Sequence, residues 1–268
     1  MRPAAMAVGL LAAVFVFAGS AAPPTEARAV RAASVESPDI VGGTAATENY
    51  SFMASMQGTK DGDPNCGASL IKPDWLVTAA HCVNGQEPAQ WRYRIGSTDR
   101  TTGGELAVPD QFVTHPKYDP TDTGDYDIAL VHLARSVTAK PVPIATRSPA
   151  HGTAIRELGW GLTCPKRGCG AAPTSLRQVD TSVVTDASCG GKDSPFDPAR
   201  ELCLDNNGGR ASTCFGDSGG PALVFTARGW SLAGVTSRGQ TLACPERPGI
   251  FTDVSAHAAW IAEQTSAR

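Results

Sequence analysis

The stretch F-G-D-S-G-G-P-A-L-V-F at residues 215–225 joins a glycine-rich turn to a short apolar run. Gly, Asp, Ser and Pro are favoured in turns for reasons unrelated to catalysis. The run P-A-L-V-F that follows is typical of a β-strand. Ser218 is therefore either a nucleophile held in a tight turn or an ordinary loop serine, and this stretch alone leaves both alternatives open.

Similar short apolar stretches recur along most of the chain. D-I-A-L-V-H-L and W-S-L-A-G-V, for example, are rich in Val, Ile and Leu and are bounded by turn-forming residues. Helical periodicity appears only near the C-terminus, where Val254, Ala258 and Ile261 share one face of V-S-A-H-A-A-W-I-A-E-Q. The sequence predicts an all-β fold, built as barrels or a sandwich, with a C-terminal α-helix.

Composition and charge narrow the range of partners. The 268 residues are 41% hydrophobic and 18% charged, enough for one large domain or two small ones. The net charge is −3 and no run of Lys or Arg occurs, so no nucleic-acid or membrane-surface partner is expected. Most basic residues are arginine, which is typical of a GC-rich genome.

The first 29 residues are interpreted as a signal peptide. Arg2 gives a positive start, and the apolar run Ala4–Ala18 is too short to span a bilayer comfortably. Cleavage is expected after Ala22 or Ala29. A membrane anchor or a buried helix is the alternative, but the polar, Pro-containing segment after the run favours a removed signal. A secreted, extracellular protein without membrane attachment follows from this interpretation.

The remainder divides into a short pro-segment at 30–39 and one domain at 40–268. The chain has eight cysteines, and an even number in an exported protein indicates disulfides. Sequence alone leaves their pairing open. Zinc is the competing interpretation, but Cys164, Cys169 and the His81-Cys82 pair lack the repeated short spacing of structural zinc ligands. No metal is expected.

A nucleophilic serine needs a base and a carboxylate that orients the base. His81, in L-V-T-A-A-H-C, is the best of five histidines, because it follows an apolar strand and precedes a cysteine that would fix its backbone. Asp127 opens an apolar strand, where a carboxylate must be paired or hydrogen-bonded. A structural imidazole and a turn-capping aspartate remain the alternatives for these two residues.

Five motifs in a fixed order together resemble a chymotrypsin-like (trypsin-family) serine protease of the type that bacteria secrete. They are I-V-G-G at 40–43, L-V-T-A-A-H-C ending at Cys82, D-I-A-L from Asp127, G-W-G at 159–161 and G-D-S-G-G-P at 216–221. The resemblance covers residue 40 to about residue 262. It implies two six-stranded antiparallel β-barrels with the site between them, and it implies a serine endopeptidase, which is a hydrolase.

Two other classes of protein are weighed against this one. G-D-S-G-G also fits the nucleophile elbow of α/β-hydrolases, which would indicate an esterase. That elbow needs a helix after the serine and the chain order Ser, Asp, His, whereas here the order is His81, Asp127, Ser218. A catalytically inactive homologue that acts as a binding protein usually lacks one of these three residues, and all three are present.

The resemblance implies a role for each residue of the site. Ser218 attacks the peptide carbonyl, His81 transfers the proton and Asp127 orients the imidazole. The backbone N–H groups of Gly216 and Ser218 form the oxyanion hole. Ser237 hydrogen-bonds the buried aspartate.

The resemblance also implies that the protein is made as a precursor. Cleavage before Ile40 would free an amine that pairs with Asp217 and orders the oxyanion hole, and this pair is not expected in an uncleaved chain. The residue before Ile40 is Asp39 rather than Arg or Lys, so trypsin itself would not cut there.

The resemblance implies three disulfides, and the fourth follows by elimination. The implied pairs are Cys66–Cys82, Cys189–Cys203 and Cys214–Cys244, which leaves Cys164–Cys169.

The specificity pocket is expected at Ser212, Thr213, Ser237, Gly239 and Gly249. Ser212 stands where trypsins carry an aspartate, so a bound Lys or Arg side chain would be buried unpaired. A chymotrypsin-like preference for large apolar or aromatic side chains is expected instead. Arg238 replaces an aromatic residue of the family and is expected to point to solvent.

Protein or peptide substrates are expected, with protein protease inhibitors as further partners, and the chain is expected to be a monomer without a cofactor. Calcium is disfavoured, because Ser97 replaces a glutamate of calcium-binding relatives. Asp99 and Glu105 alone are too few ligands for that ion.

Overall fold

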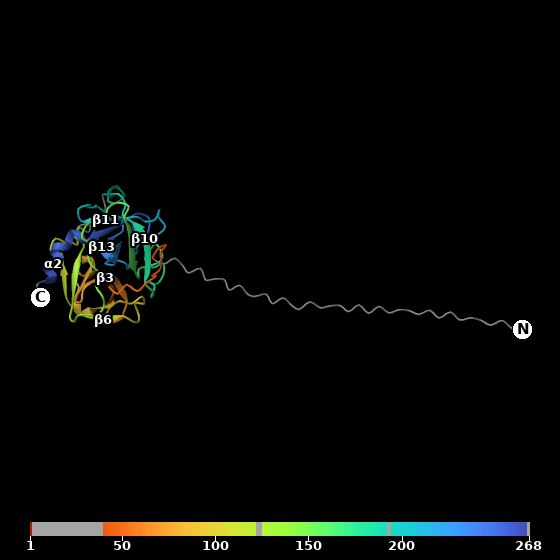
Figure 1. The fold of residues 1–268 in the computed structure, drawn as a ribbon, viewed down its shortest axis with the longest axis horizontal. Coiled ribbons are helices and arrows are strands. Elements are labelled where there is room, and N and C mark those ends of the chain that lie inside the picture. Colours follow the sequence, from red (N-terminus) through yellow and green to blue (C-terminus); the bar gives the residue numbers. More distant parts are fainter. Residues whose placement is uncertain (2–39, 122–124, 192–193, 267–268) are drawn as a thin grey trace. The chain divides into compact units, whose positions relative to one another are not determined.

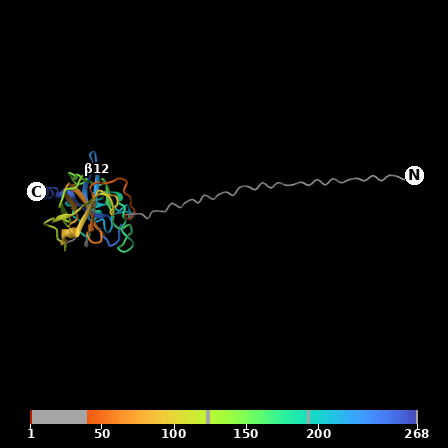
Figure 2. The ribbon, with the colours of Figure 1, turned by 90° about the horizontal axis from the view of Figure 1, so that it is seen from below.

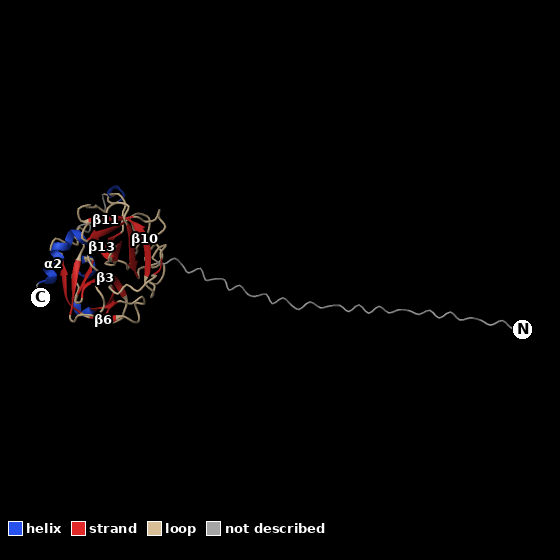
Figure 3. Cartoon of the chain, in the orientation of Figure 1, coloured by secondary structure: helices blue, strands red, loops and turns tan. Residues whose placement is uncertain are grey.

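Two antiparallel sheets carry most of the described chain, and a short helix ends it (Figures 1 and 3). The computed structural model describes Met1 and residues 40–121, 125–191 and 194–266. The pro-segment expected at 30–39 lies outside the described residues, as does the signal peptide apart from Met1. No described helix has the length and apolar character needed to cross a membrane.

The first sheet closes through one bent stretch of chain. Its strand order is β6-β5-β2-β3-β4-β8-β7. Val108 alone separates β6 from β7, and these two strands pair with β5 and β8 at opposite ends of the sheet. The bounds are β2 (Met53–Gly58), β3 (Pro64–Lys72), β4 (Trp75–Thr78), β5 (Trp91–Ile95), β6 (Glu105–Ala107), β7 (Pro109–Thr114) and β8 (Ala129–Leu133). The short helices α1 (Ala80–Val83) and η1 (Pro88–Gln90) lie between its strands in the sequence.

The second sheet has the strand order β1-β10-β9-β12-β13-β14-β11. A bridge between Val183 and Leu204 joins the end of β10 to β11 and brings its two sides together. The bounds are β1 (Thr44–Ala45), β9 (Ala154–Gly159), β10 (Arg177–Ser182), β11 (Glu201–Leu204), β12 (Pro221–Thr226), β13 (Gly229–Arg238) and β14 (Gly249–Asp253), with the short helix η2 (Asp186–Ser188) before β11.

The predicted all-β fold of two antiparallel barrels is confirmed, with a difference in the number of strands. Each sheet has seven strands rather than the expected six. The extra strand in the first sheet arises because β6 and β7 are two halves of one bent stretch. In the second sheet, the two-residue strand β1 adds to the edge.

The main hydrophobic core draws on both sheets. Met53, Leu70 and Leu130 from the first sheet and Leu158 and Leu223 from the second are all fully buried in one cluster. Burying a side chain of this size contributes about 1.5–3 kcal/mol. This shared core fixes the two barrels against each other, and residues from both can therefore form one rigid site.

The C-terminal helix begins with a 3₁₀ turn, η3 (Val254–His257), and continues as α2 (Ala258–Ser266) on the outside of the barrels (Figures 1 and 2). Val254, His257 and Ile261 are buried, whereas Ala258 is exposed. The prediction of a helix is confirmed, but the inward position expected for Ala258 is wrong. A 3₁₀ turn places residues three apart on one face, and this turn therefore directs His257 inward instead.

Candidate active site

Asp127 lies just before β8 and is 3% exposed. Its Oδ1 accepts the backbone N–H of His81 at 2.9 Å, and its Oδ2 lies 2.7 Å from His81 Nδ1. The same Oδ2 accepts the Ser237 hydroxyl at 2.7 Å, and the Asp127 carbonyl accepts the Thr252 hydroxyl at 2.8 Å. A buried carboxylate with this many donors is held in one orientation.

His81 is the second residue of helix α1, which follows β4 after a single residue. The Cys66–Cys82 disulfide ties this helix to β3. Burial lowers the pKa of His81, but the hydrogen bond and the negative charge of Asp127 outweigh it, so the net pKa is raised. Because Nδ1 faces Asp127, Nε2 is the ring nitrogen left to exchange a proton with a substrate.

Ser218 lies in a tight turn that contacts both sheets. Gly67 in β3 donates its N–H to the Ser218 carbonyl at 2.7 Å, and the Gly219 N–H donates to Thr236 in β13 at 2.8 Å. Gly219 has φ +77°, and a Cβ there would lie 2.2 Å from the Thr78 hydroxyl. Only glycine fits this position, which explains the glycine after Ser218.

The His81 and Ser218 side chains line one cleft of about 380 Å³, with Gly216 and Trp160 in its wall. His81 comes from the first sheet, and Ser218 comes from the loop before β12 of the second. No hydrogen bond joins the Ser218 hydroxyl to the His81 ring among the described residues. A gap of this kind is common in unliganded sites and closes when substrate binds.

Asp217 is fully buried beneath this loop. It accepts the N–H groups of Gly161 at 2.7 Å and Cys214 at 2.8 Å. A Cβ on Gly159 would lie 1.8 Å from the Asp217 carboxylate, so the first glycine of G-W-G makes space for it. Burial raises the pKa of Asp217 to about 6, although its hydrogen bonds oppose this.

Ile40, the residue expected to pair with Asp217 after cleavage, is also fully buried. Its side chain packs against Val179 and Ala211. The structure therefore places the start of the I-V-G-G motif inside the protein, even though residue 39 is still attached.

Four disulfides join Cys66–Cys82, Cys164–Cys169, Cys189–Cys203 and Cys214–Cys244. The Cys164–Cys169 loop reaches the cleft, where Arg167 and Gly168 line the wall. The Arg167 guanidinium lies 4.3 Å from the centre of the Phe215 ring. Arg167 could not be predicted as a cleft residue, because no local sequence pattern relates this loop to Ser218.

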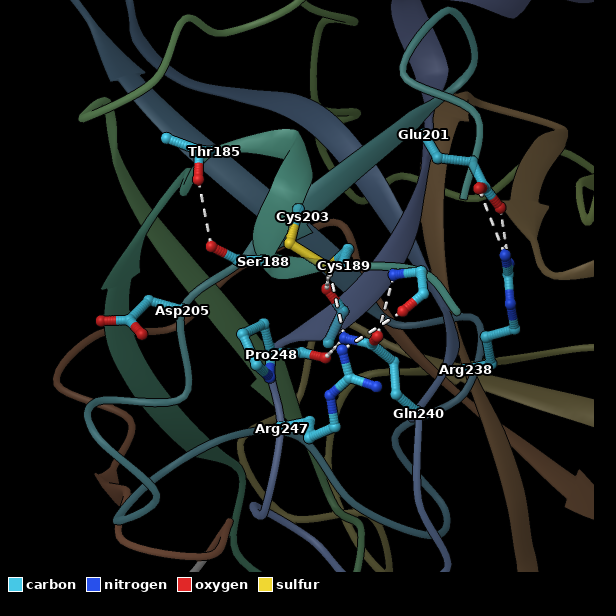
Figure 4. Close-up of a disulfide and its surroundings, with 12 residues drawn as sticks. Thr185, Ser188, Cys189, Glu201, Cys203, Asp205, Arg238, Gln240, Arg247 and Pro248 are labelled. Atoms are coloured by element: carbon cyan, nitrogen blue, oxygen red, sulfur yellow. Dashed lines mark hydrogen bonds and ion pairs between the residues drawn. A yellow bond between two sulfur atoms is a disulfide. The ribbon is translucent and has the colours of Figure 1, made fainter. Parts of the chain in front are cut away.

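The residues expected in the specificity pocket come from neighbouring segments. Ser237 and Gly249 lie on the paired strands β13 and β14, and Ser212 is buried in the loop before Ser218. Gln240 ties this region together, because its amide donates to the Pro248 carbonyl at 2.6 Å and accepts the Gly190 N–H at 2.9 Å (Figure 4).

The expectation that Arg238 points to solvent is wrong. Its side chain is 17% exposed and pairs with Glu201 on β11, whose side chain is 2% exposed (Figure 4). Burial raises the pKa of Glu201, although the hydrogen bond and charge of Arg238 oppose this shift. Arg238 turns inward because a buried carboxylate needs a positive partner. The sequence gives no signal for this pair, because the two residues are 37 positions apart.

Arg238→Met is expected to lower the free energy of unfolding by about 3–5 kcal/mol, because it leaves the Glu201 charge buried without a partner. The double variant Arg238→Met/Glu201→Met should recover most of this loss. Urea denaturation of the two variants tests the pair. Arg156→Met and Arg200→Met lose ion pairs as well, so Arg135→Met, at an exposed arginine, is the control for the loss of an arginine charge and should change the free energy of unfolding by less than about 0.5 kcal/mol. Equal loss in the single and double variants would contradict the prediction.

Two groups of possible metal ligands have other roles. Asp99 accepts the N–H and hydroxyl of Thr101, and Glu105 accepts the N–H and hydroxyl of Thr138. Cys66 and Cys82, which lie near His81, are joined in a disulfide and cannot supply thiolates.

Comparison of the chain with known proteins shows which family it belongs to. The family model described as Trypsin matches residues 40–261. The chain belongs to the trypsin family. Among its relatives, Trypsin alpha-4 of Lucilia cuprina is 33% identical over 236 residues, covering 85% of this chain and 88% of that protein. Hypodermin-B of Hypoderma lineatum is 34% identical over 232 residues, covering 84% and 86%.

Transmembrane protease serine 11E of Mus musculus is also 34% identical, over 84% of this chain but only 54% of that protein. Membership of the trypsin family establishes a serine endopeptidase, a hydrolase that acts on proteins or peptides. These relatives come from insects and a mammal, so they do not support the bacterial type that was expected from the sequence.

Proposed function

We propose that this serine endopeptidase cuts peptide bonds through an acyl-enzyme formed on Ser218. The hydroxyl oxygen attacks the peptide carbonyl while His81 Nε2 takes its proton. His81 then returns the proton to the leaving amine, and water releases the acyl group by the same route. The N–H groups of Gly216 and Ser218 stabilise the negative oxygen of the intermediate.

One observation carries this proposal: Asp127 binds both the backbone N–H and the Nδ1 of His81, while His81 and Ser218 face the same cleft. The contact at Nδ1 fixes the tautomer of the imidazole, the contact at the backbone N–H fixes the residue that carries it, and together they direct Nε2 toward the position of a substrate. A binding protein without activity would have no need of this arrangement.

Labelling with diisopropyl fluorophosphate, followed by casein hydrolysis, tests the proposal. A protease is labelled once, at Ser218, and loses its activity against casein. Absence of labelling in the mature protein would instead indicate the inactive homologue. Labelling without casein hydrolysis would indicate an esterase.

We further propose that the protein is secreted as a precursor. In this scheme residues 1–29 are a signal peptide, 30–39 a pro-segment and 40–268 the protease domain. Cleavage between Asp39 and Ile40 frees the amine that pairs with Asp217. The mature enzyme is proposed to act as a monomer outside the cell, with protein inhibitors as further partners.

Peptides with Phe, Tyr or Leu before the cut bond should be cleaved about 10²-fold faster than those with Arg, because the proposed pocket has no carboxylate to pair with a guanidinium. Chromogenic peptides that differ at this residue alone measure the ratio. Ser212→Asp should raise cleavage after Arg, whereas the matched control Ser212→Ala should keep the preference for Phe. Faster cleavage after Arg by the unmodified enzyme would overturn this pocket assignment.

A further inference from the structure

Two buried carboxyl groups lie side by side beneath the loop that carries Ser218. Glu157 on β9 is 1% exposed, and Asp217 is fully buried. The Thr213 N–H donates to Glu157 Oε2 at 3.2 Å, and the next N–H, of Cys214, donates to Asp217 Oδ2 at 2.8 Å. Because consecutive peptide groups bind the two carboxyl groups, the two side chains must be neighbours.

This pair has no positive partner within residues 40–121, 125–191 and 194–266. Burial raises the pKa of Glu157 to about 8. The hydrogen bond from the Thr213 N–H lowers this pKa, and the negative charge of Asp217 raises it. The strands on either side place Val179 and Ala222 opposite Glu157, and Arg177 lies two residues further along β10, opposite Gly159. Asp217 is the group whose charge acts on the Glu157 pKa. Two adjacent buried carboxylates repel each other, and a cation between them would offset this repulsion.

The start of the protease domain reaches the same place. Ile40 packs against Val179, which is the cross-strand partner of Glu157. The Val41 carbonyl accepts the Ser212 N–H at 3.0 Å, one residue before the N–H that binds Glu157. Residues 40 and 41 therefore run beside the segment that holds both carboxyl groups.

We propose that Glu157 is a second carboxylate of the site that binds the α-ammonium of Ile40 after cleavage. The inference rests on the activation scheme proposed above. An ammonium group has three donors, and both Asp217 oxygens already accept a backbone N–H. Glu157 Oε1 accepts no hydrogen bond from the described residues, so it can take one of the three. Glu157 is in this sense a positioning residue, which acts on the oxyanion hole through Ile40 and Asp217.

If Glu157 binds the Ile40 ammonium, the mature enzyme should keep its activity to higher pH. A free α-amine loses its charge near pH 8, and each neighbouring carboxylate raises the pKa of that amine. Activity that depends on the ammonium is present below this pKa and is lost as the pH rises through it. Removing the Glu157 charge should therefore move the loss of activity to lower pH.

We expect Glu157→Gln to shift the alkaline limb of kcat/KM down by about one pH unit, with kcat/KM at pH 7 within about threefold of the unmodified enzyme. Asp180→Asn is the matched control. It also removes one negative charge, next to Val179 in the sequence, but Asp180 is exposed and pairs with Arg156. The control should leave the limb unchanged. An unchanged limb in Glu157→Gln would overturn the inference.

N-terminal sequencing separates this result from failure of the activation scheme. If the active enzyme begins at a residue other than Ile40, both the scheme and the role of Glu157 are wrong. If it begins at Ile40 and Glu157→Gln behaves like the control, the inference alone is wrong.

A second measurement does not depend on the folding of a variant. In protein labelled with ¹³C at glutamate carboxyl carbons, the Glu157 pKa should fall by at least about one unit between precursor and mature enzyme. An equal Glu157 pKa in the two forms would show that the ammonium does not reach this carboxylate.

Discussion

Ser218→Ala in the mature enzyme should lower kcat by about 10⁴–10⁶, because the acyl-enzyme can no longer form. KM should change little, since the hydroxyl makes no hydrogen bond to another described side chain and its loss leaves the cleft intact. Steady-state cleavage of a chromogenic peptide measures both constants. Labelling by diisopropyl fluorophosphate should disappear in the same variant.

The control for this prediction must show that the fold survives. Ser218 is partly exposed, and its contacts with Gly67 go through the backbone carbonyl rather than the side chain. The urea midpoint of Ser218→Ala should therefore match that of the unmodified enzyme. Ser231→Ala, at a buried serine on β13 away from the cleft, controls for the loss of a hydroxyl. A Ser218→Ala enzyme with more than a tenth of normal kcat would remove Ser218 from the mechanism.

Asp217→Asn should lower kcat/KM of the mature enzyme by about 10²–10³, the cost of losing one oxyanion donor. The amide cannot pair with the Ile40 ammonium, and Asp217 lies directly between Gly216 and Ser218, whose N–H groups are proposed to hold the oxyanion. The loss should fall on kcat rather than on KM, because an oxyanion forms only during the reaction.

The matched control for Asp217→Asn is again Asp180→Asn, which changes charge outside the cleft. Sequencing must first show that the variant begins at Ile40, so that a failure of cleavage is not mistaken for a failure of the mature site. An Asp217→Asn enzyme that begins at Ile40 and keeps normal kcat would contradict the proposed pairing.

Local patterns in the sequence were sufficient for the fold class. Short apolar runs between turn formers predicted the strands, and the strand pattern after Ser218 excluded a nucleophile elbow. The glycine after Ser218 has a positive φ angle that an L side chain rarely adopts, so a turn could be predicted from residue type alone. The C-terminal helix was predicted as well, although its first turn is 3₁₀ and moves His257 rather than Ala258 inward.

Contacts between polar side chains far apart in the sequence could not be predicted in the same way. His81 and Asp127 are 46 positions apart and Ser237 and Asp127 are 110, and only their resemblance to family motifs suggested that they meet. Arg238 and Glu201, and Glu157 and Asp217, had no such motif. That the residues of each pair lie together is seen only in the folded structure.

Strands and turns follow from local sequence, because backbone preference and short apolar runs depend on neighbouring residues. Which buried charges face each other depends on the closed barrels, because closure and strand register bring distant segments together. Arg238 therefore pairs with Glu201 instead of facing water, and Glu157 lies next to Asp217 with no ion pair to a basic side chain in the described part of the chain.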